Sequence, residues 1–325
     1  MNEDTLSPSY DVVVIGGGAA GLSGALMLAR ARRATAVIDA GHPRNAPAGG
    51  VHGLLGREGV PPLELAARGR AEARSYGAHI ITGEVVTTTR NPTGDFTVTL
   101  ADGRTTTARR LLITTGLEDV LPDIPGAAAR WGKDLVHCPY CHGYEVRDQP
   151  LGVIATGPMS VHQALLFRQW TADLVLFTHD QPLPSEEDAE KLAARGVQVI
   201  TGPIASLDTT DGRLTAITLA DGRSIPRAAA AAATGMRARA GFIAGLDLAL
   251  APHPSGMGHY LPAEPTGKTT APGVWAAGNV TDLSAQVGAA AAGAALAAAH
   301  LNGDLVTEET QAAVDAHRAR ATTAV

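Results

Sequence analysis

The feature that most constrains the fold of this chain is a glycine-rich turn close to its amino terminus. An apolar run at residues 10–15, YDVVVI, leads into GGGAAG at 16–21, and an apolar periodicity then predicts a helix to about residue 32. A second apolar run, TAVID, ends in Asp39. A dinucleotide-binding α/β fold typically has, in this order, a strand, a G-x-G-x-x-G turn, a helix, a second strand and a carboxylate.

The residue types in this turn suit a bound pyrophosphate. Gly16 permits the tight turn, Gly18 lets the backbone approach the phosphates, and Gly21 lets the helix pack closely on the strand. The amino end of the helix stabilises phosphate charge, and Asp39 can accept hydrogen bonds from ribose hydroxyls. The predicted dinucleotide contacts of this segment are Gly16, Gly18, Ala19, Ala20, Gly21 and Asp39.

An internal repeat indicates that the chain holds two such folds. TLADGR at 99–104 precedes an apolar run that ends in Thr-Gly at Gly116, and TLADGR at 218–223 precedes another that ends at Gly235. Between the copies, residues 151–170 again predict a strand, a turn and a helix. We therefore predict an α/β protein with two nested Rossmann-like domains. The outer domain comprises residues 1–116 and 239–325, and the inserted domain comprises residues 117–238.

The only two cysteines lie in the segment HCPYCHGYE at residues 137–145. Cys138 and Cys141 are three positions apart, and His137 and His142 lie directly beside them. A zinc site would need further ligands in a tetrahedral array, and the sequence has no second C-x-x-C. C-x-x-C-H also matches covalent haem attachment, and an inert structural pair is a third alternative. A redox-active pair fits best, because flanking histidines favour the reactive thiolate.

Three motifs together resemble the low-molecular-weight thioredoxin reductase family over residues 9–305. They are GGGAAG, the C-x-x-C just ahead of the inserted domain's first strand, and GVWAAGNVTD at 273–282. The resemblance implies FAD in the outer domain, a cysteine pair near the flavin ring, and a homodimer. Besides the glycine turn and Asp39, the FAD contacts that it implies are Arg44, Asn45, His52, Val85, Gly116, Asn279, Asp282, Gln286 and Val287. Asn279 stands where the family has an aspartate, so this position departs from the family pattern.

The resemblance also divides the work of the two cysteines. It implies that Cys138 exchanges with the substrate and that Cys141 faces the flavin. His142 takes the place of the acid that follows the second cysteine in the family, and an imidazole suits the task of a thiol base. His137 is the alternative base, Glu145 could orient either ring, and a purely structural role for each histidine stays open.

The inserted domain departs from a thioredoxin reductase at its nucleotide turn. In ATGPMS at 155–160 only the middle glycine remains, and Pro158 has no amide N–H to offer a phosphate. Where the family has His-Arg-Arg, this chain has His179-Asp180-Gln181, so the arginines that bind a 2′-phosphate are missing. We expect that nicotinamide binding is lost, with a divergent working NADPH site as the alternative. Reducing equivalents then enter from a dithiol and leave to molecular oxygen as hydrogen peroxide.

HCPYCHGYE combined with a degraded NADPH site resembles the FAD-dependent dithiol oxidases that close a disulfide in a small molecule, of the gliotoxin and holomycin types. The Ala-, Arg- and Gly-rich composition favours the holomycin (dithiolopyrrolone) type, which belongs to antibiotic biosynthesis. The rival hypotheses are a thioredoxin reductase supplied by NADPH or ferredoxin, a non-catalytic flavoprotein, and a general protein-disulfide oxidase.

Charge and hydropathy argue against other classes of function. The net charge of −6 comes from interspersed acids and bases, so no surface for nucleic acid or membrane is predicted. No apolar run reaches the roughly 20 residues that span a bilayer. The acidic start MNEDTLSPSYD is unlike a signal peptide. We expect a cytoplasmic protein without a metal, whose partners are a small dithiol and oxygen.

Overall fold

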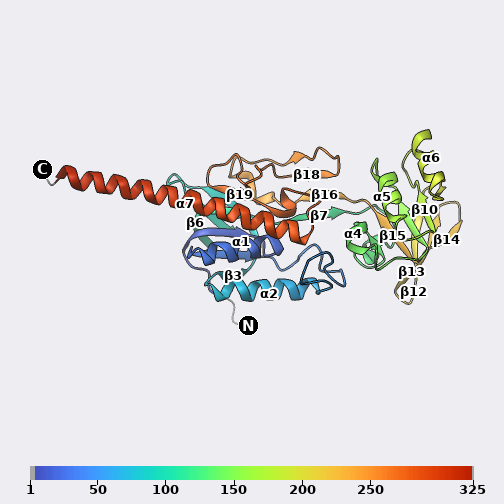
Figure 1. The fold of residues 1–325 in the computed structure, drawn as a ribbon, viewed down its shortest axis with the longest axis horizontal. Coiled ribbons are helices and arrows are strands. Elements are labelled where there is room, and N and C mark those ends of the chain that lie inside the picture. The colour runs from blue at the N-terminus through green and yellow to red at the C-terminus, as the bar shows by residue number, and fades with distance from the viewer. Residues whose placement is uncertain (1–3, 324–325) are drawn as a thin grey trace. The chain divides into compact units, whose positions relative to one another are not determined.

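The chain divides into two compact units in a computed structural model that describes residues 4–323 (Figure 1). The described part of the first unit comes from Met1–Arg44, Leu63–Glu118 and Met236–Val325, and the second comprises Asn45–Pro62 and Asp119–Gly235. The chain thus leaves the first unit and later returns to it, as in two nested α/β domains. Asn45–Pro62 groups with the second unit, which the sequence did not predict.

A seven-stranded sheet forms the centre of the first unit. Its order is β3-β2-β1-β6-β5-β4, and β19 pairs with β6 beyond the end of β5. Strands β1, β2, β3, β6 and β19 pair in parallel, whereas β4 and β5 pair antiparallel. The bounds are β1 Ser9–Ile15, β2 Thr35–Asp39, β3 His79–Thr82, β4 Val85–Arg90, β5 Phe96–Leu100, β6 Thr105–Ile113 and β19 Val274–Ala276.

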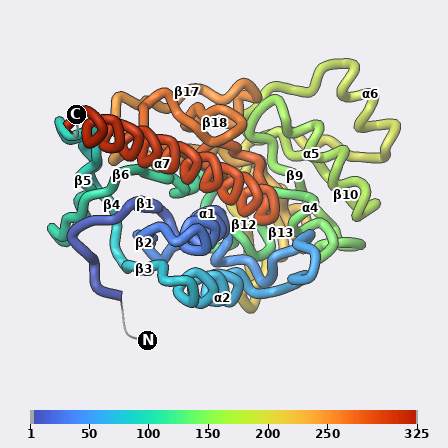
Figure 2. The backbone as a smooth tube through the Cα atoms, turned by 60° about the vertical axis from the view of Figure 1, so that its left-hand side comes forward, coloured from blue at the N-terminus to red at the C-terminus, as the bar shows by residue number. Residues whose placement is uncertain are grey.

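Helices α1 (Ala19–Arg30) and α7 (Val287–Thr323) lie side by side in the first unit, as Figure 2 shows. Leu28, Leu112 and Leu301 are fully buried in the apolar cluster that joins these helices to the sheet. Burial of apolar surface of this kind is the main stabilising contribution to such a layer. The predicted helix to about residue 32 ends at Arg30, because Arg32 has a left-handed φ of 64°.

The remaining elements of the first unit are shorter. Helix α2 covers Pro62–Ser75, and the 3₁₀ helices are η1 Gly241–Ala244 and η2 Gly278–Val280. A small sheet has the order β17-β18-β16-β7. Its strands are β7 Leu117–Val120, β16 Gly235–Ala238, β17 Ala251–Pro252 and β18 Gly258–Tyr260. Strands β7 and β16 contain two of the points at which the chain passes between the units, and the other two lie at the ends of Asn45–Pro62.

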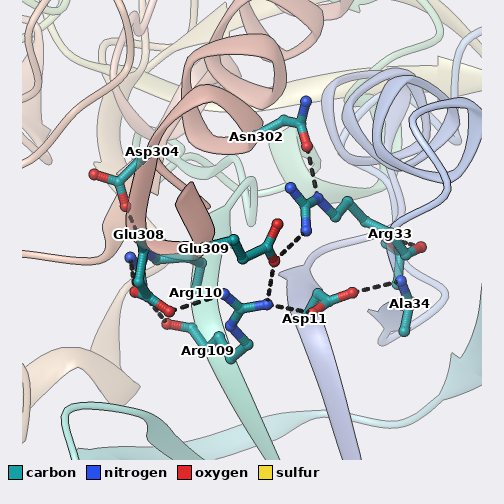
Figure 3. Close-up of polar contacts among 10 residues, drawn as sticks. Asp11, Arg33, Ala34, Arg109, Arg110, Asn302, Asp304, Glu308 and Glu309 are labelled. Carbon is teal, nitrogen blue, oxygen red and sulfur yellow. Dashed lines mark hydrogen bonds and ion pairs between the residues drawn. The ribbon is translucent and has the colours of Figure 1, made fainter. Parts of the chain in front are cut away.

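Ion pairs fix the middle of α7 to the sheet (Figure 3). Arg109 on β6 contacts Glu308 at 2.8 Å and Glu309 at 2.7 Å, and Arg110 contacts Glu308 at 2.5 Å. Arg33 contacts Glu309 at 2.6 Å. Hydrogen bonds from Arg33 and Arg109 lower the pKa of Glu309 from its ordinary value of 4.5 to about 2. Beyond these contacts α7 continues to Thr323 with almost every side chain exposed.

The second unit is built on a five-stranded parallel sheet of order β11-β10-β9-β15-β8, with a three-stranded antiparallel sheet of order β12-β13-β14. The strands are β8 Leu135–Val136, β9 Leu151–Ile154, β10 Leu174–Phe177, β11 Gln198–Ile200, β12 Ile204–Thr210, β13 Arg213–Leu219, β14 Ser224–Pro226 and β15 Ala229–Ala232. The helices are α3 Ala127–Arg130, α4 Pro139–His142, α5 Ser160–Phe167 and α6 Glu186–Ala194.

The internal repeat is confirmed as two equivalent β-hairpins, β5–β6 and β13–β14. In each TLADGR segment the leucine N–H donates to the arginine carbonyl at 2.9 Å. Asp102 Oδ1 accepts from the N–H of Arg104, and Asp221 Oδ1 accepts from the N–H of Arg223, both at 3.0 Å. The repeated sequence therefore encodes the same turn in both units.

Candidate active site

The C-x-x-C segment forms a single helical turn that begins directly after β8. Cys138 is the N-cap of α4 and Pro139 opens the helix, a position where the missing N–H costs nothing. The Cys138 Sγ atom accepts a hydrogen bond from the Cys141 N–H at 3.2 Å. Both cysteines are half-buried. A donor aimed at Sγ favours a thiolate on Cys138, which suits a leaving group or nucleophile in disulfide exchange.

Trp170 packs against this helical turn and was not singled out by the sequence. Its ring meets Tyr140 edge-on at a centroid distance of 6.0 Å. A Cβ atom on Gly143 would lie only 2.7 Å from the Trp170 ring and would also meet the Pro139 carbonyl oxygen. Gly143 therefore follows the cysteine motif because no side chain fits beneath the indole. Tyr140 itself is 65% exposed.

His137 is held by the backbone of the parallel sheet. Its Nδ1 atom lies 3.2 Å from the carbonyl oxygen of Ala232 and 3.4 Å from the N–H of Thr234, at the end of β15. Gln163 on α5 donates to the His137 carbonyl oxygen at 2.7 Å. These contacts engage one ring nitrogen and the main chain. They favour a structural role for His137 and leave its assignment as a base a prediction.

His142 has a different environment from His137. Within residues 4–323 neither ring nitrogen of His142 has a hydrogen-bond partner, and both are shielded from solvent. Burial lowers the pKa of His142 below its ordinary value of 6.5, Glu145 opposes this shift, and His52 and His137 add to it. At neutral pH the ring is thus an unprotonated imidazole beside Cys141. Buried polar atoms are normally bonded, so this exception points to a reactive group.

The predicted FAD contact His52 lies between two carboxylates of the second unit. Its Nδ1 atom is 2.7 Å from Glu58 Oε1, and its Nε2 atom is 3.5 Å from Glu145 Oε1. Glu58 Oε2 also accepts from the N–H of Gly53 at 2.8 Å. The hydrogen bond from His52, followed by that from Gly53, lowers the pKa of Glu58. The structure thus brings His52 to the motif of Cys141 and His142, a juxtaposition that the sequence did not predict.

The glycine turn of the first unit has the geometry that a pyrophosphate needs. Gly16 has a φ of 108°, and a Cβ atom on Gly21 would collide with the Gly16 carbonyl oxygen. Gly18 is the N-cap of α1, offers no side chain to the helix N–H groups, and has open space around its Cβ direction. Asp39 lies at the end of β2 next to Gly17. The turn therefore leaves its donors to an anionic ligand, and these residues fit FAD.

The other predicted FAD contacts are distributed over both units. Asn45 and His52 belong to the second unit, and the rest belong to the first. The Asn279 Nδ2 atom donates to the carbonyl oxygens of Asp282 at 3.0 Å and Ala285 at 2.9 Å. A carboxylate could not donate these bonds, which gives a physical reason for asparagine at this departure from the family pattern. The Arg44 guanidinium contacts the sulfur of Met236, and the Asp282 carboxylate accepts the N–H of Ser284. Val85 is the first residue of β4, and Gly116 has a φ of 71°. Gln286 directly precedes Val287, the first residue of α7.

The nucleotide turn of the second unit is bonded to itself. The Ser160 Oγ atom accepts from the N–H of Thr156 at 3.0 Å and from the N–H of Gly157 at 3.3 Å. Pro158, between them and Ser160, has no N–H. Further along, His179 Nδ1 accepts from the N–H of Ile204 at 3.0 Å. Two N–H donors of this turn are thus already bonded within it and a third is missing, so the turn offers fewer donors to the phosphates of a pyridine dinucleotide.

The described residues 4–323 contain neither a candidate membrane-spanning helix nor a candidate metal cluster. No helix there is both long and apolar enough for a membrane span. No three or more histidine, cysteine, aspartate or glutamate side chains there are grouped so that they could hold a metal ion.

Two nested Rossmann-like domains with a C-x-x-C helix in the inserted one define the class of the disulfide oxidoreductases. The chain matches the model of the pyridine nucleotide-disulphide oxidoreductase family over residues 10–312, and it belongs to that family. It is therefore an oxidoreductase with the architecture of a low-molecular-weight thioredoxin reductase.

Individual relatives agree with this assignment. The thioredoxin reductase tcpT of Claviceps purpurea is 33% identical over 279 residues, which cover 83% of this chain and 86% of the relative. The crystal structure of HlmI is 44% identical, covers 100% of both chains and has a TM-score of 0.91. An oxidoreductase from Agrobacterium tumefaciens is 37% identical, with a TM-score of 0.86 over 92% of this chain and 99% of that one.

Proposed function

We propose that this protein is an FAD-dependent dithiol oxidase, which closes an intramolecular disulfide in a small molecule and passes the electrons to oxygen. The observation that carries the proposal is the self-bonded nucleotide turn of the second unit, beside an intact cysteine helix. Thr156 and Gly157 donate their N–H groups to Ser160, so these two donors are not available to the phosphates of NADPH. The cysteines are then the simplest entry for electrons.

The chain's own residues support each thiol step. A substrate thiolate forms a bond to Cys138, and the Cys138–Cys141 bond breaks with Cys141 leaving as a thiolate. His142, an unprotonated imidazole, takes the proton of the second substrate thiol. The second substrate sulfur then attacks the substrate sulfur that is bonded to Cys138. Cys138 leaves as a thiolate, whose Sγ atom accepts the hydrogen bond from the Cys141 N–H. Gly16, Gly18 and Gly21 would hold FAD, which would supply a two-electron acceptor for the reduced cysteine pair and a route to oxygen, so that two protons and oxygen would give hydrogen peroxide.

Different residues of the first unit would hold the pyrophosphate and the ribose of FAD. Gly16, Gly18 and Gly21 would hold the FAD pyrophosphate on the amino end of α1, with Asp39 for the ribose. We extend the proposal to a dithiolopyrrolone substrate of the holomycin type and to a homodimer, both on the resemblance to dithiol oxidases.

A second candidate function is a thioredoxin-reductase-like enzyme that takes electrons from NADPH or ferredoxin. The names of several relatives, including the thioredoxin reductase tcpT of Claviceps purpurea, favour it. It requires electron flow from a carrier to the cysteines, whereas the dithiol oxidase requires the reverse.

Oxygen consumption tests the proposal directly. The purified yellow protein, supplied with dithiothreitol as a ring-closing dithiol, is expected to consume oxygen and to form one hydrogen peroxide per disulfide. Cys138→Ser and Cys141→Ser should each abolish this turnover while retaining the flavin. Turnover by both serine variants at the wild-type rate would reject the role of the pair. Oxygen uptake with NADPH but not with the dithiol would favour the reductase.

A further inference from the structure

The strap Asn45–Pro62 of the second unit is an ordered loop with a closed base. Val51 and Val60 form an antiparallel bridge, in which the Val51 N–H donates to the Val60 carbonyl oxygen at 2.8 Å. The Gly59 N–H returns a bond to the Val51 carbonyl oxygen at 2.9 Å. Both valines are buried. His52 follows this bridge directly, so its backbone is fixed although residues 45–61 contain no helix or named strand.

Glu58, on the same strap, orients the ring of His52. One carboxylate oxygen lies 2.7 Å from His52 Nδ1, and the other accepts the Gly53 N–H at 2.8 Å. Both oxygens are therefore engaged, and the carboxylate cannot turn without losing a bond. With Nδ1 directed at Glu58, the opposite nitrogen of the ring, Nε2, is directed at Glu145 at 3.5 Å.

Glu145 connects the strap to the cysteine helix. It follows His142 by three residues, and its side chain is 43% exposed, so its contact with His52 opposes the rotamer freedom that such a side chain has. The charged and titratable groups that act on His142 are Glu145, His52 and His137. Of these, Glu145 is the one that favours the imidazolium form, because it carries the opposite charge.

We propose that His52, held by Glu58, is a positioning residue that keeps the Glu145 carboxylate facing His142, so that this imidazole remains a competent base in its desolvated place. The inference rests on the proposed function for its chemical meaning, since it assigns His142 the thiol proton. It gives the strap a role in thiol chemistry, in addition to the flavin contact expected for His52.

The sign of the effect follows from the charges. An imidazole that has lost its facing carboxylate holds a proton less tightly and is a weaker base. Removal of His52 also removes a repulsion, which acts in the opposite direction. Glu145 has a larger influence on the pKa of His142 than His52 has, so release of the carboxylate decides the outcome.

The test compares His52→Ala and His52→Gln in the flavin-loaded protein, with His162→Ala as a matched control at an exposed histidine of α5. Proton binding to His142 is followed by carbon-13 histidine NMR, with His142→Gln to assign the signal, and the rate of flavin bleaching by dithiothreitol is followed against pH. In His52→Ala the His142 midpoint should move to lower pH and the bleaching rate at pH 7 should fall about tenfold. His52→Gln should have nearly the wild-type His142 midpoint and bleaching rate, because its amide can donate to Glu145. The control should equal wild type.

Three outcomes would overturn the inference. One is an unchanged His142 midpoint in His52→Ala, and another is a midpoint that moves to higher pH. The third is a loss in His52→Gln as large as that in His52→Ala, since this would make His52 a proton carrier. Glu58→Gln is a second probe should His52→Ala fold poorly, and it should shift the midpoint in the same direction. The NMR midpoint needs no turnover, so failure of the dithiol oxidase proposal would appear separately, as a wild-type protein that no dithiol bleaches.

Discussion

Replacement of Ser160 by alanine probes the self-bonded nucleotide turn most sharply. Ser160 is buried, and its hydroxyl oxygen accepts two backbone N–H groups, from Thr156 at 3.0 Å and from Gly157 at 3.3 Å. Alanine removes the acceptor and leaves the turn otherwise intact. The mutation isolates the contact that we propose has replaced a phosphate.

The size of the stability loss expected for Ser160→Ala follows from the exposure of the two N–H donors. Thr156 and Gly157 are half-buried, so water can reach their N–H groups once the hydroxyl is gone. The cost is then the net value of each hydrogen bond, about 0.5–1.5 kcal/mol, and not the larger penalty of a sealed donor. Two bonds give a loss of ~1–3 kcal/mol in the free energy of unfolding of the second unit.

Urea denaturation and amide hydrogen exchange test this prediction, because they report the free energy of unfolding and the protection of individual N–H groups. Ser160→Ala should unfold at lower urea, and the amides of Thr156 and Gly157 should exchange faster. Ser224→Ala, at an exposed serine of the same unit, should change the free energy by less than about 0.5 kcal/mol. Unchanged stability and exchange in Ser160→Ala would refute the reasoning. NADPH should still fail to bleach the flavin of this variant, because Pro158 supplies no donor.

Three further predictions follow from the site and its scaffold. Gly143→Ala should cost ~1–3 kcal/mol in urea denaturation and slow dithiol oxidation, because its Cβ atom would lie 2.7 Å from the Trp170 ring; unaltered stability would contradict this packing. Because burial lowers the pKa of His142 below its ordinary value of 6.5, the ratio of the wild-type dithiol oxidation rate to that of His142→Gln should stay constant from pH 8 to 6.5 and decline only below 6.5; a ratio that begins to decline above pH 6.5 would contradict the environment described. The lowered pKa of Glu309 stabilises the folded protein above pH 4.5, and this contribution should disappear as the pH falls towards about 2. The melting temperature of wild type should therefore fall more steeply than that of Glu309→Gln over this range, and parallel curves would contradict the ion-pair assignment.

Local sequence patterns predicted the scaffold well. The strand at Thr35–Asp39 and the amino end of α1 follow from apolar periodicity and the glycine turn, which act over a few residues. The TLADGR hairpins follow from turn chemistry, since the aspartate side chain bonds the backbone two residues on. The nested order of the two units follows from the repeat.

The contacts that define the site were harder to predict from the sequence, because they join segments that lie far apart in the chain. Glu58 and Glu145 meet at His52 across 87 positions, and neither residue type nor spacing marks the pair. The packing of Trp170 on Gly143 likewise needs the path of the chain between them. The degraded nucleotide turn was predicted from its missing glycines, but its closure by Ser160 was not, since serine at a helix start is common.

Flavin absorbance under anaerobic conditions distinguishes electron entry from a dithiol from electron entry from NADPH. The yellow protein is mixed with dithiothreitol in one cell and with NADPH in another, and air is then readmitted. We expect that the dithiol alone bleaches the flavin and that air restores the colour with formation of hydrogen peroxide. Fast bleaching by NADPH would contradict it, because the second unit would then hold a working nucleotide site despite the bonds to Ser160.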